Sequence, residues 1–151
     1  MKLATALSER SDLQNRITEL SGRLNQNAKV FEGDSPAEDP KELMGELDRD
    51  IDRLEYLISR INITNNVTKN GGVTITELLA KRDCLKQKIT VLRSFLDNAS
   101  NRINRYTKTE LKINSTVSVA KLQKEVDSLS TELRKTDELI QELNWTTDLI
   151  E

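Results

Sequence analysis

Hydrophobic residues recur every three or four positions through most of the chain, which is the spacing of one face of an α-helix. Four such stripes can be traced, and the first two are separated by VFEGDSPAEDP (30–40), a loop-like run of Gly, Pro and acidic residues. The stripes consist of Leu3, Ala6, Arg10, Leu13, Ile17, Leu20 and Leu24; of Met44, Leu47, Ile51, Leu54, Ile58 and Ile61; of Leu78, Arg82, Leu85, Ile89, Leu92, Leu96, Ala99 and Ile103; and of Val119, Leu122, Val126, Leu129, Leu133, Thr136, Ile140 and Leu143. They predict four long helices over about residues 2–28, 39–65, 75–105 and 118–145.

Start signals support two of these helices. Asp39 can cap the second helix, Pro40 suits its first turn, and Glu42 can reach back as in a capping box. Ser118 can cap the fourth helix. These residues predict that the two helices begin close to residues 39 and 118.

Two segments between the helices are extended in character. NVTKNGGVTI (66–75) predicts a β-hairpin, because Asn70-Gly71 favours the positive-φ turn that matches strand twist. The run 106–117 mixes β-branched and polar residues and is expected to be extended. Since neither segment has a local partner, we expect them to pair between two copies of an antiparallel dimer.

The fold class predicted from these elements is mainly all-α. Helices of near-equal length joined by short connections favour an antiparallel four-helix bundle of long, coiled-coil-like helices. The small β-hairpin is an insertion in this bundle. A length of 151 residues suits one domain, so 1–151 is expected to form a single helical-bundle domain.

Two arginines interrupt the apolar stripes. Arg10 and Arg82 occupy positions that are otherwise filled almost entirely by apolar residues. One interpretation is that each packs its stem along the seam, pairs with a carboxylate of a neighbouring helix, and fixes the register of the bundle. The other is that both arginines converge on a bound anion. The sequence leaves both interpretations open.

The composition argues against catalysis. There is no His, the residue most often used as a general base and metal ligand, which excludes the Glu-x-x-His motifs of di-iron bundles. The one cysteine, Cys84, is expected to be a partly buried structural residue, with no intrachain disulfide. We therefore expect a non-enzymatic protein with no cofactor and no metal. The first ten residues reach charged side chains quickly, so we also expect a cytoplasmic protein.

The most basic stretch of the chain lies after the third stripe. Arg102, Arg105, Lys108 and Lys112 surround Tyr106, and such a set can contact phosphate and stack a base. A net charge of −2 argues against nucleic acid as the main partner. The alternative is that these cations suit the C-terminal dipole of the third helix.

The chain ends in NWTTDLIE (144–151), which contains its one Trp, Trp145. The fourth stripe stops at Leu143, and Trp145 with Leu149 and Ile150 offers a compact apolar cluster. We expect this tail to be a clasp that docks on the bundle end or across a dimer interface. A partner-binding tip is the alternative, since Trp is favoured at interface hot spots.

Four segments in order, AEDPKELMGELD, TELLAKRDCLK, SNRINRYTKTELK and NWTTDLIE, resemble an uncharacterised bacterial family of helical proteins, some members of which carry the label septicolysin. The resemblance covers the whole chain and implies, through that label, a membrane-active cytolysin. The residues themselves favour a homo-oligomer, a dimer or higher, that serves as a scaffold or binds a protein partner. Membrane activity and polyanion binding are the alternative functions. A narrow apolar face opposite a face of mixed charge suits a partner helix better than a bilayer.

Overall fold

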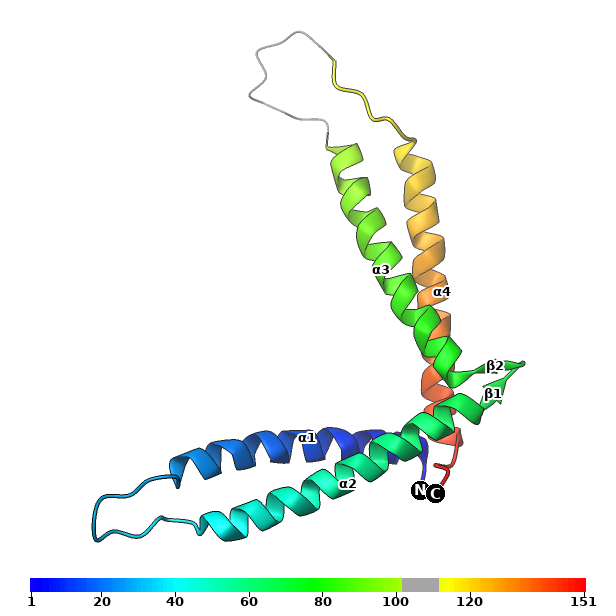
Figure 1. The fold of residues 1–151 in the computed structure, drawn as a ribbon. Helices are drawn as coiled ribbons and strands as arrows, with labels where there is room; N and C mark the ends of the chain where they lie inside the picture. The colour runs from blue at the N-terminus through cyan, green and yellow to red at the C-terminus, as the bar shows by residue number, and fades with distance from the viewer. Residues whose placement is uncertain (102–111) are drawn as a thin grey trace. The chain divides into compact units, whose positions relative to one another are not determined.

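The computed structural model describes residues 1–101 and 112–151. Within these residues the chain forms four helices and one two-stranded antiparallel sheet (Figure 1). The elements are α1 (Leu3–Gln26), α2 (Pro40–Val67), β1 (Lys69–Asn70), β2 (Val73–Thr74), α3 (Ile75–Ser100) and α4 (Val119–Thr146). The prediction of a mainly helical chain with a short hairpin before the third helix is confirmed. The arrangement of the helices as a four-helix bundle stays a prediction.

The chain divides into two compact units. Unit 1 consists of Met1–Thr74 and Leu143–Glu151, and unit 2 consists of Ile75–Glu142. In unit 1 α1 and α2 form a helical hairpin joined by the loop 27–39, and in unit 2 α3 lies beside α4 (Figure 1). The prediction of one bundle domain stays a prediction.

Side-chain caps fix where two of the helices begin, as the sequence indicates. The Asp39 carboxylate accepts a hydrogen bond of 2.9 Å from the Lys41 backbone N–H, and Pro40 is the first residue of α2. The Ser118 hydroxyl accepts a hydrogen bond of 3.4 Å from the Lys121 backbone N–H at the start of α4. Each cap satisfies a backbone donor that the first helical turn leaves without a partner.

The end of α1 is tied to the loop that follows it. The Asn27 side chain donates a hydrogen bond of 2.8 Å to the Arg23 carbonyl and accepts one of 3.0 Å from the Glu38 backbone N–H. The Glu38 carboxylate in turn pairs with the Arg23 guanidinium. These contacts close the loop against α1 and bring the chain back to the start of α2.

The predicted hairpin forms, with its turn one residue later than the sequence indicated. Asn70 pairs with Val73, so the two turn residues are Gly71 and Gly72 rather than Asn70 and Gly71. Both glycines have positive φ, 57° and 88°, as a two-residue turn between twisted strands requires. The predicted extended run 106–117 is described only from residue 112, and 112–117 form neither helix nor strand.

The α1 stripe is the buried face of that helix, as predicted, but the α2 stripe is not. The expected Met44, Ile51 and Ile58 are exposed. The buried residues of α2 are Leu43, Asp50, Leu57, Ile61 and Thr64. The buried face is therefore rotated by about one residue, because Asp50 and Thr64 enter the seam with their polar groups hydrogen-bonded.

In unit 2 part of each predicted stripe is buried. On α3 Leu78, Ile89 and Leu96 are buried. On α4 the buried residues of the stripe within unit 2 are Leu122, Val126, Thr136 and Ile140. The described stripe residues of unit 2 are therefore buried or half-buried, and Ile75 is a buried residue that the stripe does not include.

The C-terminal segment closes unit 1 by pairing with the N-terminus. The Leu3 backbone N–H donates to the Thr147 carbonyl at 2.9 Å, and the Leu149 N–H donates to the Met1 carbonyl at 2.8 Å. These bonds make an antiparallel bridge between Lys2 and Asp148, whose side chains also form an ion pair of 2.9 Å. The tail therefore clasps the N-terminus of unit 1, and docking on a bundle end or across a dimer interface stays a prediction.

The clasp uses Leu149 and not Trp145. Leu149 is 6% exposed, and the Ile150 backbone N–H donates a hydrogen bond of 3.0 Å to the hydroxyl of the fully buried Thr64 in α2. Trp145 is 67% exposed, so the expected cluster of Trp145 with the final apolar residues is wrong. The reason is that α4 continues to Thr146, which turns Trp145, two positions after the seam residue Leu143, away from the buried face.

Candidate interaction surfaces

The α1–α2 seam of unit 1 is an antiparallel coiled coil, and heptad letters describe its surroundings. With the buried residues at positions a and d, the g positions of α1 are Glu9, Arg16 and Arg23, and those of α2 include Glu46 and Arg53. The e positions of α1 are Leu7, Gln14 and Ser21, and those of α2 are Met44, Ile51 and Ile58. The two sides of the seam therefore differ in chemistry.

The g side, which we call the charged flank, is closed by ion pairs between the two helices. Arg53 donates from Nε to Glu9 Oε1 at 2.7 Å and from Nη2 to Oε2 at 3.0 Å. Arg16 donates to both carboxylate oxygens of Asp50, which is buried in the seam at a d position. Arg23 Nη1 lies 3.7 Å from Glu46 Oε2. The cross-links run antiparallel and fix the register of the hairpin.

The same contacts shift the pKa values of their carboxyl groups. The hydrogen bond from Arg53 lowers the pKa of Glu9, and that from Arg23 lowers the pKa of Glu38. The hydrogen bond and charge of Lys2 lower the pKa of Asp148 in the clasp. All three carboxyl groups belong to unit 1.

We expect unit 1 to lose stability in acid because of these carboxylates. A carboxyl whose pKa is lower in the folded state stabilises the fold above its unfolded pKa of about 4, and this stabilisation is lost as pH falls through the folded pKa. Circular-dichroism melts between pH 7 and pH 3 should therefore show the melting temperature falling below about pH 4. In Glu9→Gln the fall should be shallower, and an equal fall in this variant would contradict the assignment to the Glu9–Arg53 pair.

The e side, which we call the open flank, is apolar and uncovered within unit 1. Met44, Ile51 and Ile58 are 51%, 43% and 38% exposed, and each lies seven residues from the next, so they form one row along α2. Leu7 on α1 is half-buried, and Gln14 and Ser21 continue its row. Apolar residues at a, d and e are typical of a helix that packs on more than one neighbour, whereas a two-helix seam needs a and d alone.

The α3–α4 seam of unit 2 has polar contacts on both sides. On one side Lys81 Nζ lies 2.9 Å from Glu132 Oε1. On the other side the Arg93 guanidinium donates a hydrogen bond of 3.3 Å to the Ser130 hydroxyl. Both sides of this seam therefore carry a polar contact, although α3 also exposes the apolar Val91 and Phe95.

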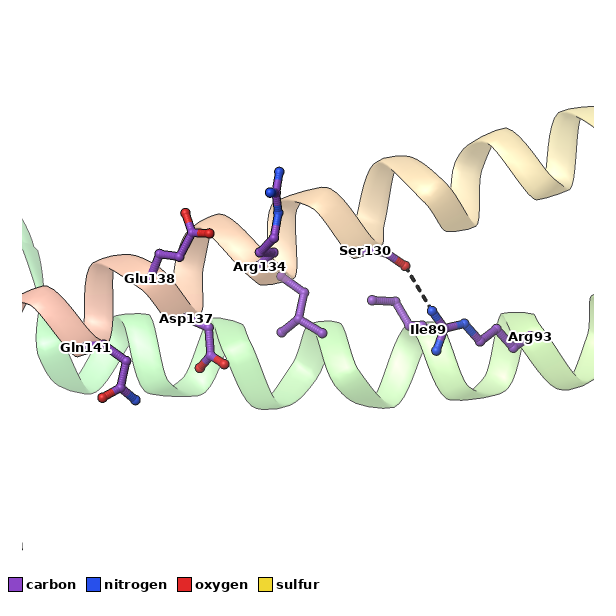
Figure 2. Close-up of a pocket in the computed structure, with 8 residues that line it drawn as sticks. Ile89, Arg93, Ser130, Arg134, Asp137, Glu138 and Gln141 are labelled. Atoms are coloured by element: carbon purple, nitrogen blue, oxygen red, sulfur yellow. Dashed lines mark hydrogen bonds between the residues drawn. The ribbon is translucent and has the colours of Figure 1, made fainter. Parts of the chain in front are cut away.

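A groove of about 630 Å³ lies along α3 and α4 in unit 2 (Figure 2). Ile89 and Leu133 give it an apolar floor, and the other residues that line it are Arg93, Ser130, Arg134, Asp137, Glu138 and Gln141. Figure 2 shows Arg93 meeting Ser130, Asp137 and Gln141 directed toward α3, and Arg134 and Glu138 directed away from it. The rim thus mixes both signs of charge and indicates no particular class of ligand.

The two seam arginines lie in different surroundings. Arg82 is half-buried in unit 2, where its guanidinium bonds to Asp83 and lies 3.9 Å from Asp137 of α4. Arg10 is half-buried in unit 1, and in the described part of the chain no ion pair of Arg10 is found. Their roles in setting register, or in binding an anion, stay predictions.

The other candidate residues are only partly described. Arg102, Arg105, Tyr106 and Lys108 lie outside the described residues, and Lys112 is exposed. Their contacts with a polyanion stay a prediction, as does a partner contact by the exposed Trp145. The residues that the sequence analysis missed are those of the open flank, which it assigned to the buried seam.

The described residues contain no group of three or more His, Cys, Asp or Glu side chains arranged to hold a metal ion. Cys84 is exposed on α3, so the expectation that it is partly buried is wrong. It lies on the outer face of the helix, one position before the seam residue Leu85. No helix in the described part of the chain is long and apolar enough to cross a membrane.

Residues 10–149 match a family described as a family of unknown function (DUF6847). A crystal structure of a functionally unknown conserved protein from Corynebacterium diphtheriae is similar over 99% of both chains, with 40% sequence identity and a TM-score of 0.88. No curated protein matches the chain. These comparisons relate the chain to a bacterial protein of the same fold, and they carry no information on cytolytic activity.

Proposed function

The chain belongs to the DUF6847 family, and from the surfaces of its two units we propose that it is a non-enzymatic protein-interaction module that self-associates and acts as a scaffold or binds a protein partner. The observation that carries the proposal is the open flank of unit 1. It presents a row of apolar side chains on α2, all more than a third exposed.

The contrast between the two flanks supports this proposal. In unit 2 one side of the seam has the Lys81–Glu132 ion pair and the other has the Arg93–Ser130 hydrogen bond. In unit 1 one side has three interhelical ion pairs and the other has an apolar row. Exposed apolar rows of this kind are favoured at sites where another protein surface packs.

We also propose that the protein is cytoplasmic. The chain has a single cysteine, Cys84, which is exposed on α3 and has no second cysteine in the chain with which to pair. An exposed free thiol is best maintained in a reducing compartment.

Sedimentation equilibrium tests the proposal. The full chain has a mass of 17.2 kDa, and we expect its apparent mass to rise toward a multiple of that value between about 1 and 100 μM, the range of a micromolar dissociation constant. A mass of 17.2 kDa at every concentration would contradict self-association. Release of dye from lipid vesicles at submicromolar protein would favour the membrane-active alternative instead.

A further inference from the structure

We propose that the open flank of unit 1 is the self-association surface and that its occupant is the open flank of a second copy, so that two α1–α2 hairpins form an intermolecular antiparallel four-helix bundle. This inference rests on the proposed function and names its surface. Three observations support it: the charge pattern beside the flank, the position of Arg10, and the size of the face.

The residues that border the open flank are uncharged on α1 and acidic in part on α2. On α1 the border consists of uncharged residues, namely Ala4, Ser11, Thr18 and Asn25. On α2 the border carries the exposed acids Asp48 and Glu55. The cation that completes the pattern is Arg10, which occupies an a position of α1, half-buried at the edge of the open flank.

The position of Arg10 along the hairpin indicates how two copies meet. Its neighbour Glu9 pairs with Arg53 of α2, so Arg10 lies at the level of residues 53–55. A two-fold axis parallel to the helices leaves the height of every residue along the helix axis unchanged. It places α1 of one copy on α2 of the other. Arg10 then faces Glu55 of the second copy, and by symmetry Glu55 of the first copy faces Arg10 of the second.

The other symmetric arrangement leaves Arg10 without a partner. A two-fold axis perpendicular to the helices places α1 on α1 in antiparallel order, so Arg10 faces α1 of the second copy. The open side of α1 carries no acid, as its e and b positions are uncharged throughout Leu3–Gln26. Burial of an unpaired guanidinium is costly, so the parallel axis is favoured.

The size of the face fits a stable interface. Helices of 24 and 28 residues are about 36–42 Å long, and two helices side by side are about 20 Å wide. The face therefore has an area of about 700–800 Å², close to the ~800 Å² per partner of a standard-size protein interface. Met44, Ile51 and Ile58 extend along about half of this length.

The test compares the dissociation constants of matched variants by sedimentation equilibrium. Ile51→Glu places a charge at the centre of the flank and is expected to weaken association by about a hundredfold or more, because the carboxylate is buried without a partner. Val91→Glu is the matched control: Val91 is exposed on α3 in unit 2, and we expect this variant to associate like the wild type.

Charge reversal tests the Arg10–Glu55 contact and the direction of the axis. Arg10→Glu and Glu55→Arg are each expected to weaken association about tenfold, and the double variant should restore most of the affinity. Glu55 is exposed, so Glu55→Arg is informative even if Arg10→Glu fails to fold.

The outcomes separate the two proposals. If Ile51→Glu associates like the wild type, or if Val91→Glu dissociates the protein, the open flank is not the interface, while self-association stands. If the double charge reversal is no tighter than Glu55→Arg alone, the Arg10–Glu55 contact and the parallel axis are wrong. If the wild type is monomeric at every concentration, both proposals fail.

Discussion

Removal of residues 147–151 is expected to lower the melting temperature by about 10 °C or more. The truncation deletes the buried Leu149 side chain, and loss of a buried leucine typically costs about 2–5 kcal/mol. It also removes the backbone hydrogen bonds to Met1 and Leu3 and the one from Ile150 to Thr64, at about 1 kcal/mol each. The measurement is a thermal melt of the truncated chain beside the full chain.

Two point variants separate the clasp from the tryptophan. Leu149→Ala is expected to reproduce a large part of the loss, because it leaves a cavity against α2 while the backbone bridge can remain. Trp145→Ala is expected to change the free energy of unfolding by less than about 0.5 kcal/mol, because the indole is 67% exposed. A larger loss from Trp145→Ala than from Leu149→Ala would show that the tail is held by other contacts.

Replacement of Arg16 by Ala is expected to cost about 1–3 kcal/mol of unfolding free energy. Asp50 is buried in the seam, and Arg16 donates to both of its carboxylate oxygens. The variant therefore leaves a buried carboxylate without its ion-pair partner. Urea unfolding, monitored by circular dichroism, measures the difference.

Replacement of Asp50 by Leu at the same contact is expected not to lower the free energy of unfolding. A leucine at this d position completes the apolar seam, and replacing a buried ion pair by packed apolar residues is often neutral or stabilising. We expect Asp50→Leu to be at least as stable as the wild type, with Arg16 left half-exposed in water. If Asp50→Leu lowered the free energy of unfolding as much as Arg16→Ala does, the ion pair would be required for the register of the hairpin.

Periodicity predicts the helices well because most seam positions are apolar. On α1, α3 and α4 the described residues of each stripe are buried or half-buried, and Arg10 and Arg82 are half-buried among them. On α2 the same reasoning is right for Leu47, Leu54 and Ile61 and wrong for the other three positions of the stripe. Counting apolar residues favours Met44, Ile51 and Ile58, whereas the seam uses Asp50 and Thr64.

The candidate surface could not be predicted from the sequence for the same reason. Two contacts decide that the d positions of α2, and not its e positions, are buried. Arg16 of α1 pairs with Asp50, and the Ile150 backbone N–H, at the far end of the chain, donates to Thr64. Both are contacts between residues distant in sequence, which local periodicity does not report. The sequence was enough to infer that the tail acts as a clasp. That the tail buries Leu149 and not Trp145 depends on where α4 ends.

The most direct test of the dimer formed by the open flank is cross-linking of Met44→Cys with a flexible bis-maleimide in a Cys84→Ser background. With the two-fold axis parallel to the helices, Met44 of each copy lies at the same level and faces the axis from the diagonally opposite α2 helices, so a reagent that spans the bundle should yield a covalent dimer. Val91→Cys in the same background should remain monomeric on the same time scale, because Val91 lies on the outer face of α3. Absence of the Met44→Cys dimer, or equally fast cross-linking of Val91→Cys, would contradict the account.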